Sequence, residues 1–370
     1  MGVRIELYKT GEQAREATVF NQRMRARGQN VFLLTEYPPR MEPDDAAIRN
    51  RYYVAQDAGS VRGGLLLATY PAWFGAGTEV DVVNCREPLS EGIIDPAWRL
   101  LGLRLLKFME QQGPRLFALG MGSEQNAFPR FLKAAKWRVS RVPFLFRVAR
   151  AGAFLREVRL LQTSPGRRLL RRLGAATGAG QVGFAALQFR AAGAALASRG
   201  MTVTPVTEWG SWVDDLWERC RGEISFSVRR DLRTVRELYP LDGRSRGFCV
   251  SRNGQPVGWV AAQLSQMKDH KYFGNLRVAT LLDGMALPDA RREVVSQVSG
   301  ALVREGAELL VTNQSHTAWV RAFRSAGYLS GPSNYILALS KQLAAEIAEQ
   351  PEGLARMHFT RGDGDGRGHL

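Results

Sequence analysis

Hydrophobic residues along the chain follow two different spacings, and the two spacings alternate. Three segments of the first half, RYYVAQ, GGLLLATYPAWF and VDVVN, have the alternating or continuous apolar pattern that is typical of strands. The next segment, Pro96–Gln111, repeats apolar residues every three or four positions, which predicts a helix with one face on a sheet. Asp95 supports this helix start, because Asp caps free N–H groups and proline is tolerated at the first helical position.

The same order of elements occurs twice. In the first half LFALGMGSEQN, AFPRFLKAAKW and FLFRVAR follow the helix, giving a strand with a polar turn, a short helix and a closing strand. In the second half RVATLLDGMAL, DARREVVSQVSGALVREG, AELLVTNQSH, AWVRAFRSAGY and YILALSK repeat this order after the hairpin GFCVSRNGQPVGWVAAQL, whose Asn253 and Gly254 favour a tight turn. The fold class is therefore α/β with two tandem domains, each a mixed, mostly antiparallel twisted sheet flanked by helices.

Composition marks the boundaries. We expect domains at 1–150 and 201–345, a linker at 151–200, and a disordered tail at 346–370 that ends in the glycine-rich and charged RGDGDGRGHL. Within the linker, SPGRRLLRRLG predicts a basic amphipathic helix, with arginines on one face and leucines on the other. This helix suits an anionic membrane surface through 165–200, or equally an interdomain linker with a solvated basic face.

Charge and cysteine content indicate the class of partner and the cellular compartment. The 370 residues carry a formal net charge of +16, which favours anionic partners. Cys85, Cys220 and Cys249 are far apart and odd in number, so a disulfide framework is excluded and a reducing compartment is favoured. The N-terminus lacks the apolar core of a signal peptide and no segment is long and apolar enough to span a membrane, so a cytoplasmic location, with peripheral membrane contact open, is expected. The four histidines have no metal-ligand spacing, and we expect no metal.

The element order and one turn resemble the GNAT acyltransferase superfamily, used here in tandem and similar to acyltransferases of bacterial surface-polysaccharide clusters. In that family the helix after the fourth strand begins with an Arg/Gln-x-x-Gly-x-Gly/Ala turn that takes the pyrophosphate of coenzyme A on its N–H groups. Arg99 and Gly102 match the turn, whereas Arg104 replaces a small residue and either pairs with phosphate or fills the channel. The second half has Arg291 and Arg292 but no glycine there. The resemblance implies acetyl-CoA or another acyl-CoA as co-substrate, with the first domain as the better site.

The same resemblance assigns further coenzyme contacts. Val82 and Val83 on the fourth strand and Asn126 after the fifth are implied to line the coenzyme site. Many family members carry a Tyr that protonates the leaving thiolate, but the equivalent positions here are Leu132 and Phe323. The thiolate is then protonated by another side chain or by water, or the protein carries out no such reaction.

The general base has three candidates by location: Glu79, Asp81 and Glu124, at the ends of the fourth and fifth strands. A carboxylate there accepts the proton of the attacking amine or hydroxyl, or is simply a surface residue.

For the acceptor, four second-half residues are candidates: Arg229, Arg230, Asp283 and Asn313. The arginines could grip a phosphate or sugar acid, or form a solvated helix face. Asp283 could shape an acceptor pocket or cap a turn.

Three functions follow from these patterns. The first is transfer of an acyl group from acyl-CoA to an amine or hydroxyl, on an anionic small molecule such as a nucleotide sugar or on a lipid-linked saccharide in cell-envelope polysaccharide synthesis. The second is a FemX-like transferase that uses aminoacyl-tRNA, which the positive charge would suit. The third is a non-catalytic binding protein that retains the tandem fold.

Overall fold

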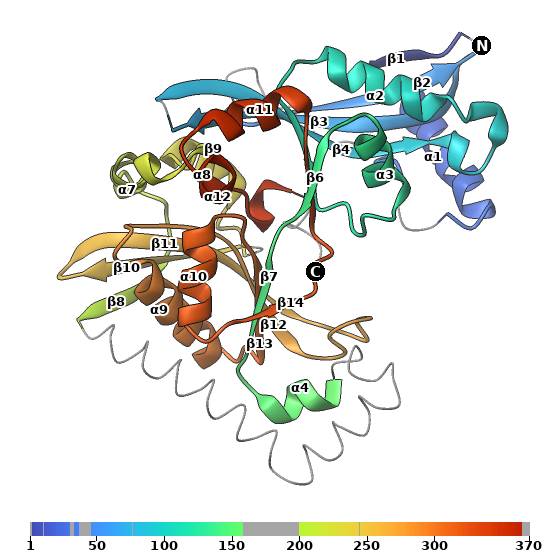
Figure 1. The fold of residues 1–370 in the computed structure, drawn as a ribbon. Helices are drawn as coiled ribbons and strands as arrows, with labels where there is room; N and C mark the ends of the chain where they lie inside the picture. The colour runs from blue at the N-terminus through green and yellow to red at the C-terminus, as the bar shows by residue number, and fades with distance from the viewer. Residues whose placement is uncertain are drawn as a thin grey trace. The chain divides into compact units, whose positions relative to one another are not determined.

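The computed structural model describes residues 2–9, 11–29, 33–36, 46–75, 77–157, 200–243 and 245–364. The chain divides into two compact units, drawn in Figure 1. Unit 1 comprises Met1–Arg141 and Ile336–Gln350, and unit 2 comprises Val142–Tyr335 and Pro351–Leu370. The predicted basic helix of the linker lies outside the described residues. No helix in the described ranges is both long and apolar enough to cross a bilayer.

Unit 1 is built on one mixed sheet. Its strands lie in the order β1 (Arg4–Leu7), β2 (Arg49–Asp57), β3 (Ser60–Phe74), β4 (Thr78–Ser90), β5 (Leu116–Leu119), β15 (Ile336–Leu339) and β6 (Arg138–Arg141). Along this path β4 and β5 are parallel and the other neighbours are antiparallel. The helices are α1 (Glu12–Ala26), α2 (Leu101–Gln111), α3 (Ala127–Ala134) and α11 (Lys341–Glu349), with short 3₁₀ turns η1 (Glu91–Ile93) and η2 (Pro96–Trp98). The helix predicted over 96–111 is therefore η2 followed by α2, whose apolar face with Leu105 and Met109 packs into the core.

Unit 2 repeats this plan. Its strands lie in the order β14 (Leu329–Gly331), β7 (Phe144–Val148), β13 (Leu309–Asn313), β12 (Arg277–Ala286), β11 (Gln255–Gln266), β10 (Arg246–Arg252) and β8 (Met201–Val206). Here β12 and β13 form the parallel pair. A further parallel pair joins β9 (Phe226–Val228) to β16 (Met357–His358). The helices are α4 (Ala151–Glu157), α7 (Trp212–Cys220), α8 (Leu232–Leu238), α9 (Arg291–Arg304), α10 (Thr317–Ser325) and α12 (Gly353–Arg356), with 3₁₀ turns η4 (Arg221–Glu223) and η5 (Arg361–Asp363).

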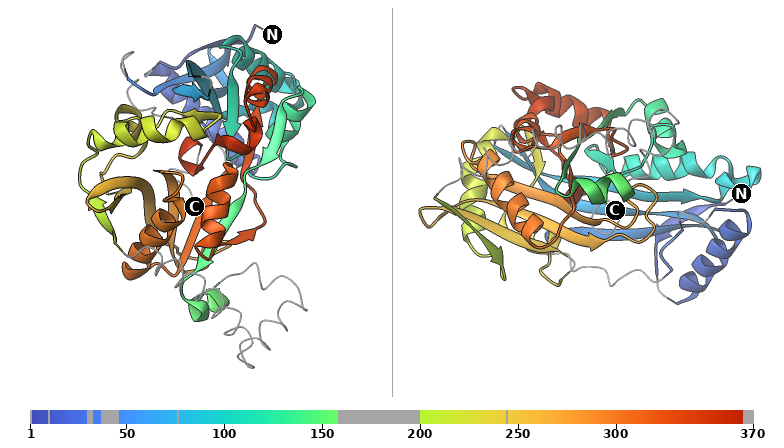
Figure 2. Two further views of the ribbon diagram at one scale, coloured as in Figure 1. Left: turned by 60° about the vertical axis from the view of Figure 1, so that its left-hand side comes forward. Right: turned by 90° about the horizontal axis from the view of Figure 1, so that it is seen from below.

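Neighbouring residues of β11 show how helices cover the second sheet, which Figure 2 displays from two further sides. A Cβ added to Gly258 would lie 2.7 Å from Val294 of α9, so Gly258 faces that helix and lets it approach closely. Trp259, the next residue, packs edge-on against Trp209 and at a tilt against Tyr239. Because successive strand residues point to opposite faces, helices and aromatic loops cover the sheet on both sides, as predicted for this fold class.

The closing strands are exchanged between the units. β6 and β7 follow each other in the chain, yet β6 pairs with β15 in unit 1 and β7 pairs with β13 in unit 2. β15 in turn lies beside β5 in unit 1. The expected boundaries at residues 150 and 345 therefore differ from the observed crossings after residues 141 and 335. The apolar pattern of a strand predicts that it will be buried but does not say which sheet it will join.

The C-terminal tail is ordered through residue 364, so the prediction of a disordered tail from residue 346 is wrong for this stretch. α11 belongs to unit 1, while α12, β16 and η5 pack in unit 2. His358, Phe359 and Asp363 are fully buried. These side chains find their partners far away in sequence, which the local composition of the tail does not reveal.

Candidate functional site

The first sheet opens between its two parallel strands. β4 and β5 pair only at Val83–Leu116 and Asn84–Phe117. Beyond this point the register of β4 against β3 shifts, with Pro88 in the irregular stretch, and β4 leads through η1 and η2 into α2. Such irregularities bend a strand and end its pairing. The edge of β4 that faced β5 is thus released after Asn84.

The N-terminus of α2 is the polar end of this opening. Its cap residue Leu100 provides no side-chain cap, so the first N–H groups of the helix keep hydrogen-bonding capacity beside the positive end of the helix dipole. A Cβ added to Gly102 meets nothing within 4 Å. Arg99 and Arg104 are exposed on either side. Free N–H groups, an open glycine and two guanidinium groups fit the phosphates of coenzyme A.

The other predicted coenzyme residues lie elsewhere. Val82 is fully buried, and the N–H of Val83 donates to Arg115 O at 3.0 Å. Both valines therefore precede the released edge of β4. Asn126 is exposed at the start of α3, where its amide donates to Met121 O at 3.0 Å and holds the turn after β5.

The three candidate bases are surface carboxylates that the structure does not bring together. Asp81 pairs with Arg49 at 2.6 Å, and Glu79 is exposed two residues earlier. Nine residues of β4, or about 30 Å of strand, separate Asp81 from the end of β4 that leads to α2. Glu124, in the turn after β5, pairs with Arg141 at 2.6 Å.

In unit 2 the corresponding helix start is closed. The cap residue of α9, Ala290, is fully buried, and Arg291 is buried with its guanidinium 4.0 Å from the carboxylate of Glu223. Burial lowers the pKa of Arg291, although the charge of Glu223 opposes this. The helix start thus has no glycine in its first turn, and its cap residue and first arginine are buried rather than open to a phosphate.

The opening of the second sheet is filled by the C-terminal segment. β12 and β13 pair only from Val278–Leu309 to Thr280–Val311, and β12 is irregular just beyond. There the tail runs against the end of β13, with a bridge between Gln314 and Thr360. The N–H of Ser315 also donates to Phe359 O at 3.0 Å.

A buried ionic network fixes this segment. Nε of Arg230 donates to Asp283 Oδ2 at 2.5 Å, and its Nη2 donates to both oxygens of Asp363 at 2.7 and 2.8 Å. Tyr239 donates its hydroxyl to Asp283 at 2.6 Å, and Nε2 of His358 lies 3.2 Å from the same carboxylate. All five side chains are fully buried. We call these residues the Arg230 network.

The pKa values of the two carboxyl groups in the Arg230 network are shifted in opposite directions. Burial raises the pKa of Asp283, but Arg230, His358 and Tyr239 together outweigh burial and hold that pKa below its usual value. For Asp363 burial outweighs the attraction of Arg230, and the charge of Asp283 adds to it, so its pKa is raised. One guanidinium therefore holds one firmly ionised carboxylate and one that takes up a proton more readily.

The predicted acceptor residues are thus dispersed. Arg230 and Asp283 bind each other in the interior. Asn313 is buried, donates to Val142 O at 3.3 Å and accepts from Arg361 at 3.1 Å. These bonds tie β13 to the segment between β6 and β7 and to the C-terminal segment.

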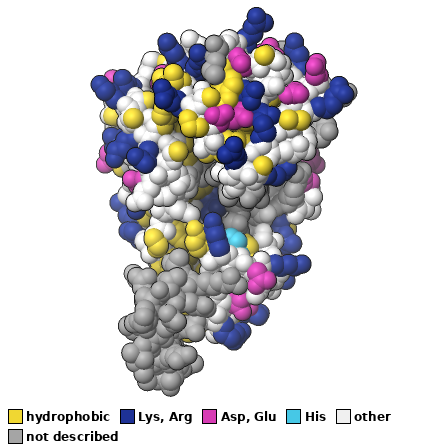
Figure 3. Space-filling view, turned by 90° about the vertical axis from the view of Figure 1, so that its right-hand side faces the viewer, with side chains coloured by type: hydrophobic (Ala, Val, Ile, Leu, Met, Phe, Trp, Pro, Cys, Tyr) yellow, Lys and Arg dark blue, Asp and Glu magenta, His cyan; other side chains and the backbone are white. Residues whose placement is uncertain are grey.

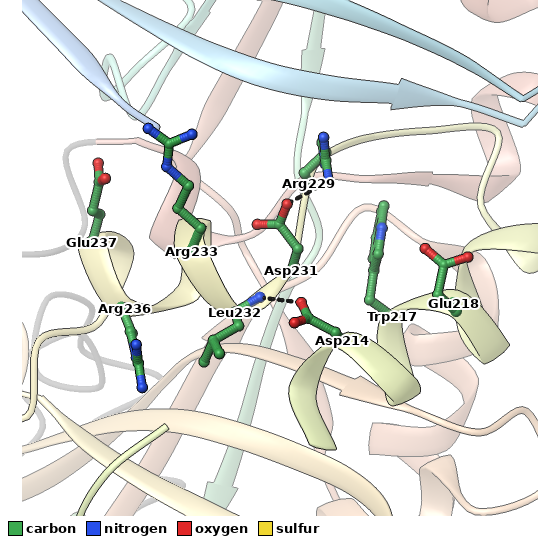
Figure 4. Close-up of a pocket in the computed structure, with 9 residues that line it drawn as sticks. All are labelled: Asp214, Trp217, Glu218, Arg229, Asp231, Leu232, Arg233, Arg236 and Glu237. Carbon is green, nitrogen blue, oxygen red and sulfur yellow. Dashed lines mark hydrogen bonds and ion pairs between the residues drawn. The ribbon is translucent and has the colours of Figure 1, made fainter. Parts of the chain in front are cut away.

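Of the four acceptor candidates, only Arg229 lines a pocket, which has a volume of ≈ 580 Å³ and lies between α7 and α8 (Figure 4). It pairs there with Asp231 at 2.6 Å, and Arg233 and Arg236 leave α8 in opposite directions. Arg236 binds Trp209 O at 2.8 Å. The lining arginines therefore do not converge on one ligand position. The residues that line it are Asp214, Trp217, Glu218, Arg229, Asp231, Leu232, Arg233, Arg236 and Glu237.

Two features of the site bear on sequence reasoning. Leu132 and Phe323, at the positions of the family tyrosine, are core residues of their units. The partners that sequence reasoning missed, His358 and Asp363, lie in the tail. A local signal existed there, since Thr360 and Asp363 form a capping box around η5 with the spacing that predicts one.

Within the described ranges no group of three or more His, Cys, Asp or Glu side chains could hold a metal ion.

Comparisons with known proteins identify the fold. No protein-family model matches the chain, and no curated protein sequence matches it. The structure is similar to a GCN5-related N-acetyltransferase from Anabaena variabilis, with a TM-score of 0.52 at 9% identity over 94% of this chain and 75% of that one. It is also similar to the N-myristoyltransferase of Saccharomyces cerevisiae with bound myristoyl-CoA, with a TM-score of 0.50 at 10% identity over 91% of this chain and 78% of that one.

A tandem GNAT protein from the clavulanic acid biosynthesis pathway covers 91% of this chain and 97% of its own, at 13% identity and a TM-score of 0.44. The likeness to the N-acetyltransferase and the N-myristoyltransferase shows the GNAT fold, and the two mixed sheets with their flanking helices show that it is arranged in two tandem units.

Proposed function

We propose that the chain is an acyltransferase whose unit 1 holds the thioester donor and passes its acyl group to an amine or hydroxyl. The observation that carries the proposal is the contrast between the two helix starts. At α2, Gly102 has open space over its Cα and Arg99 and Arg104 are exposed. At α9 the start is buried, and the adjoining opening is filled by the tail.

Each part of the site has a task in this proposal. The N–H groups of the first turn of α2 hold the phosphates, aided by Arg99 and Arg104. The released edge of β4 after Asn84 offers backbone groups for the amides of the pantetheine arm. The nucleophile attacks the thioester carbonyl, its proton passes to a base, and the thiolate leaves. Coenzyme A thus supplies the activated acyl group, while unit 1 positions it.

The finer parts of the proposal concern the acceptor and the location. An anionic acceptor, a nucleotide sugar or a lipid-linked saccharide, suits a chain with a net charge of +16. Basic side chains, dark blue in Figure 3, are spread over the face drawn there. Residues 165–200 would hold the chain at an anionic membrane surface.

Calorimetric titration with acetyl-CoA and with a longer acyl-CoA tests the proposal. Gly102→Glu places bulk and negative charge at the phosphate turn and should abolish binding. Because an added Cβ meets no atom there, the variant should remain folded. Gly300→Glu is the matched control, since Gly300 also lies within a helix, is also half-buried, and its added Cβ meets only the end of Arg304. Absence of binding to both thioesters by the unaltered protein would overturn the proposal.

A further inference from the structure

Exposed apolar side chains gather at one place on unit 1. Among the described residues five large apolar side chains are exposed, and three of them flank the start of α2: Ile93 at 56%, Leu100 at 60% and Leu103 at 53%. Gly92 packs against the turn, since an added Cβ would lie 3.1 Å from Cα of Arg99, so Ile93 lies beside it. Leu100 and Leu103 are three residues apart and share one helix face. Grouped apolar exposure of this kind marks a binding surface more often than single exposed residues do.

Basic side chains surround these three residues. Arg99, Arg104 and Lys107 are exposed, and within the part of the chain that the structure describes none of them forms an ion pair. The nearby acids are engaged elsewhere: Glu91 is buried and paired with Arg23 at 2.7 Å and Arg62 at 3.0 Å, Asp95 accepts from the N–H of Ala97 at 2.9 Å, and Glu110 accepts from Trp137 at 3.3 Å. We call the surface formed by Ile93, Arg99, Leu100, Leu103, Arg104 and Lys107 the α2 rim. It has an apolar centre and a positive border.

The α2 rim includes the proposed phosphate turn. Its exposed aliphatic side chains are not needed to bind the phosphates of coenzyme A there. A nucleotide with phosphates would pair with the arginines but would leave aliphatic side chains largely in water. A protein that carries the thioester on a phosphopantetheine arm would bury the aliphatic centre and match the cations with its own carboxylates. Apolar centres with charged borders are typical of protein interfaces.

We infer that the α2 rim is the docking surface for an acidic acyl carrier protein, which delivers the thioester on its phosphopantetheine arm. This inference rests on the proposed function, because the arm enters the same turn. Carboxylates of the carrier pair with Arg99, Arg104 and Lys107. One apolar face of the carrier covers Ile93, Leu100 and Leu103.

Binding of octanoyl-loaded carrier protein of fatty-acid synthesis and of octanoyl-CoA tests the inference by calorimetry on the full chain. The loaded carrier should bind at least tenfold more tightly than its apo form, because the arm adds its contacts to those of the rim. Ile93→Ser should weaken carrier binding at least tenfold, since central interface residues contribute most of the affinity. Binding of octanoyl-CoA should change less than twofold. Leu100 and Leu103 are left in place, because both belong to the helix start whose N–H groups the phosphate needs, and Ser at a helix cap would take up such groups.

Two further variants complete the design. Lys107→Glu should weaken carrier binding and reduce its salt dependence, because one attractive charge becomes repulsive. Val19→Ser and Leu329→Ser, which change the two exposed large apolar side chains that lie outside the rim among the described residues, should leave both ligands unaffected.

The possible failures are distinguishable. If octanoyl-CoA binds through Gly102 but the carrier does not bind, the inference is overturned and the proposed function stands. If the rim variant affects both donors equally, or lowers flotation with anionic vesicles while carrier binding is unchanged, the rim is not a carrier surface. If neither thioester binds, the proposed function and the inference fall together.

Discussion

Replacing Arg230 with Met should destabilise unit 2 strongly, although the change lies in no proposed binding site. Met keeps much of the side-chain length but removes the cation that Asp283 and Asp363 share at 2.5 and 2.7 Å. Removing one partner of a buried ion pair costs about 3–5 kcal/mol, because a charge is left without compensation. For a unit of this size about 4 kcal/mol lowers the melting temperature by roughly 8–16 °C.

Arg229 provides the matched control for this experiment. It is the preceding residue and also pairs with a carboxylate, Asp231 at 2.6 Å, but it is partly exposed. Partly exposed pairs contribute about 0–1 kcal/mol, so Arg229→Met should shift the melting temperature by about 4 °C at most. Equal shifts for the two variants would refute the assignment of the Arg230 network as the element that holds the tail.

The assay should separate local release of the tail from loss of the whole unit. Differential scanning calorimetry gives the melting temperature, and hydrogen exchange followed by mass spectrometry reports on peptides covering β9 and β16. Faster exchange of both strands is expected in Arg230→Met. Its destabilisation should shrink as pH falls from 7 to 5, because without the cation the pKa values of both buried carboxyl groups rise and protonation neutralises them. Unchanged protection of β16 would contradict the proposed role of Arg230.

Three further predictions each concern a single side chain. His316 accepts from the N–H of Ala318 at 3.2 Å and lies 3.1 Å from Glu223 O, and burial lowers its pKa to about 3. The free energy of unfolding should therefore fall as pH drops from about 6.5 toward 3, by up to about 1.4 kcal/mol per pH unit. His316→Asn, which can still cap α10, should flatten this dependence in urea titrations, and an unchanged slope would exclude His316 as its source. Burial raises the pKa of Cys220 to about 11 and also that of Cys85, so neither thiol should react with a disulfide reagent at pH 8 before unfolding; rapid labelling of either would contradict its buried position. Gly102→Ala should stabilise unit 1 by at most about 1 kcal/mol in chemical denaturation, because Ala loses less backbone entropy than Gly on entering a helix and an added Cβ meets nothing. Destabilisation would point to a close contact at that position.

The sequence predicted those features that depend on local pattern. The α/β fold class with two tandem units is confirmed, and Asn253 and Gly254 both adopt the positive φ values of the predicted tight turn, 52° and 79°. The resemblance to the GNAT turn singles out Arg99 and Gly102, and the structure leaves Arg99 exposed and Gly102 half-buried with open space over its Cα. Each of these signals lies within a few residues of the chain.

Features that depend on distant contacts were not predictable in this way. The tail contains glycine and charge, which indicated disorder, yet Asp363 finds Arg230 133 residues away. From the sequence, Arg230 is an acceptor candidate because arginine pairs with phosphates and sugar acids, and Asp283 is a candidate for shaping the acceptor pocket or capping a turn. Their mutual neutralisation in the interior depends on strands and loops that meet only in the folded unit.

The central claim is that the start of α2 holds the thioester donor, and titration with acetyl-CoA and a longer acyl-CoA tests it most directly. The account predicts binding in the micromolar range, about 8 kcal/mol, for the unaltered protein and for Gly300→Glu. Gly102→Glu should show no binding while its melting temperature is not lowered. Binding that survives in Gly102→Glu would place the donor elsewhere in the chain, and absence of binding in the unaltered protein would contradict the account.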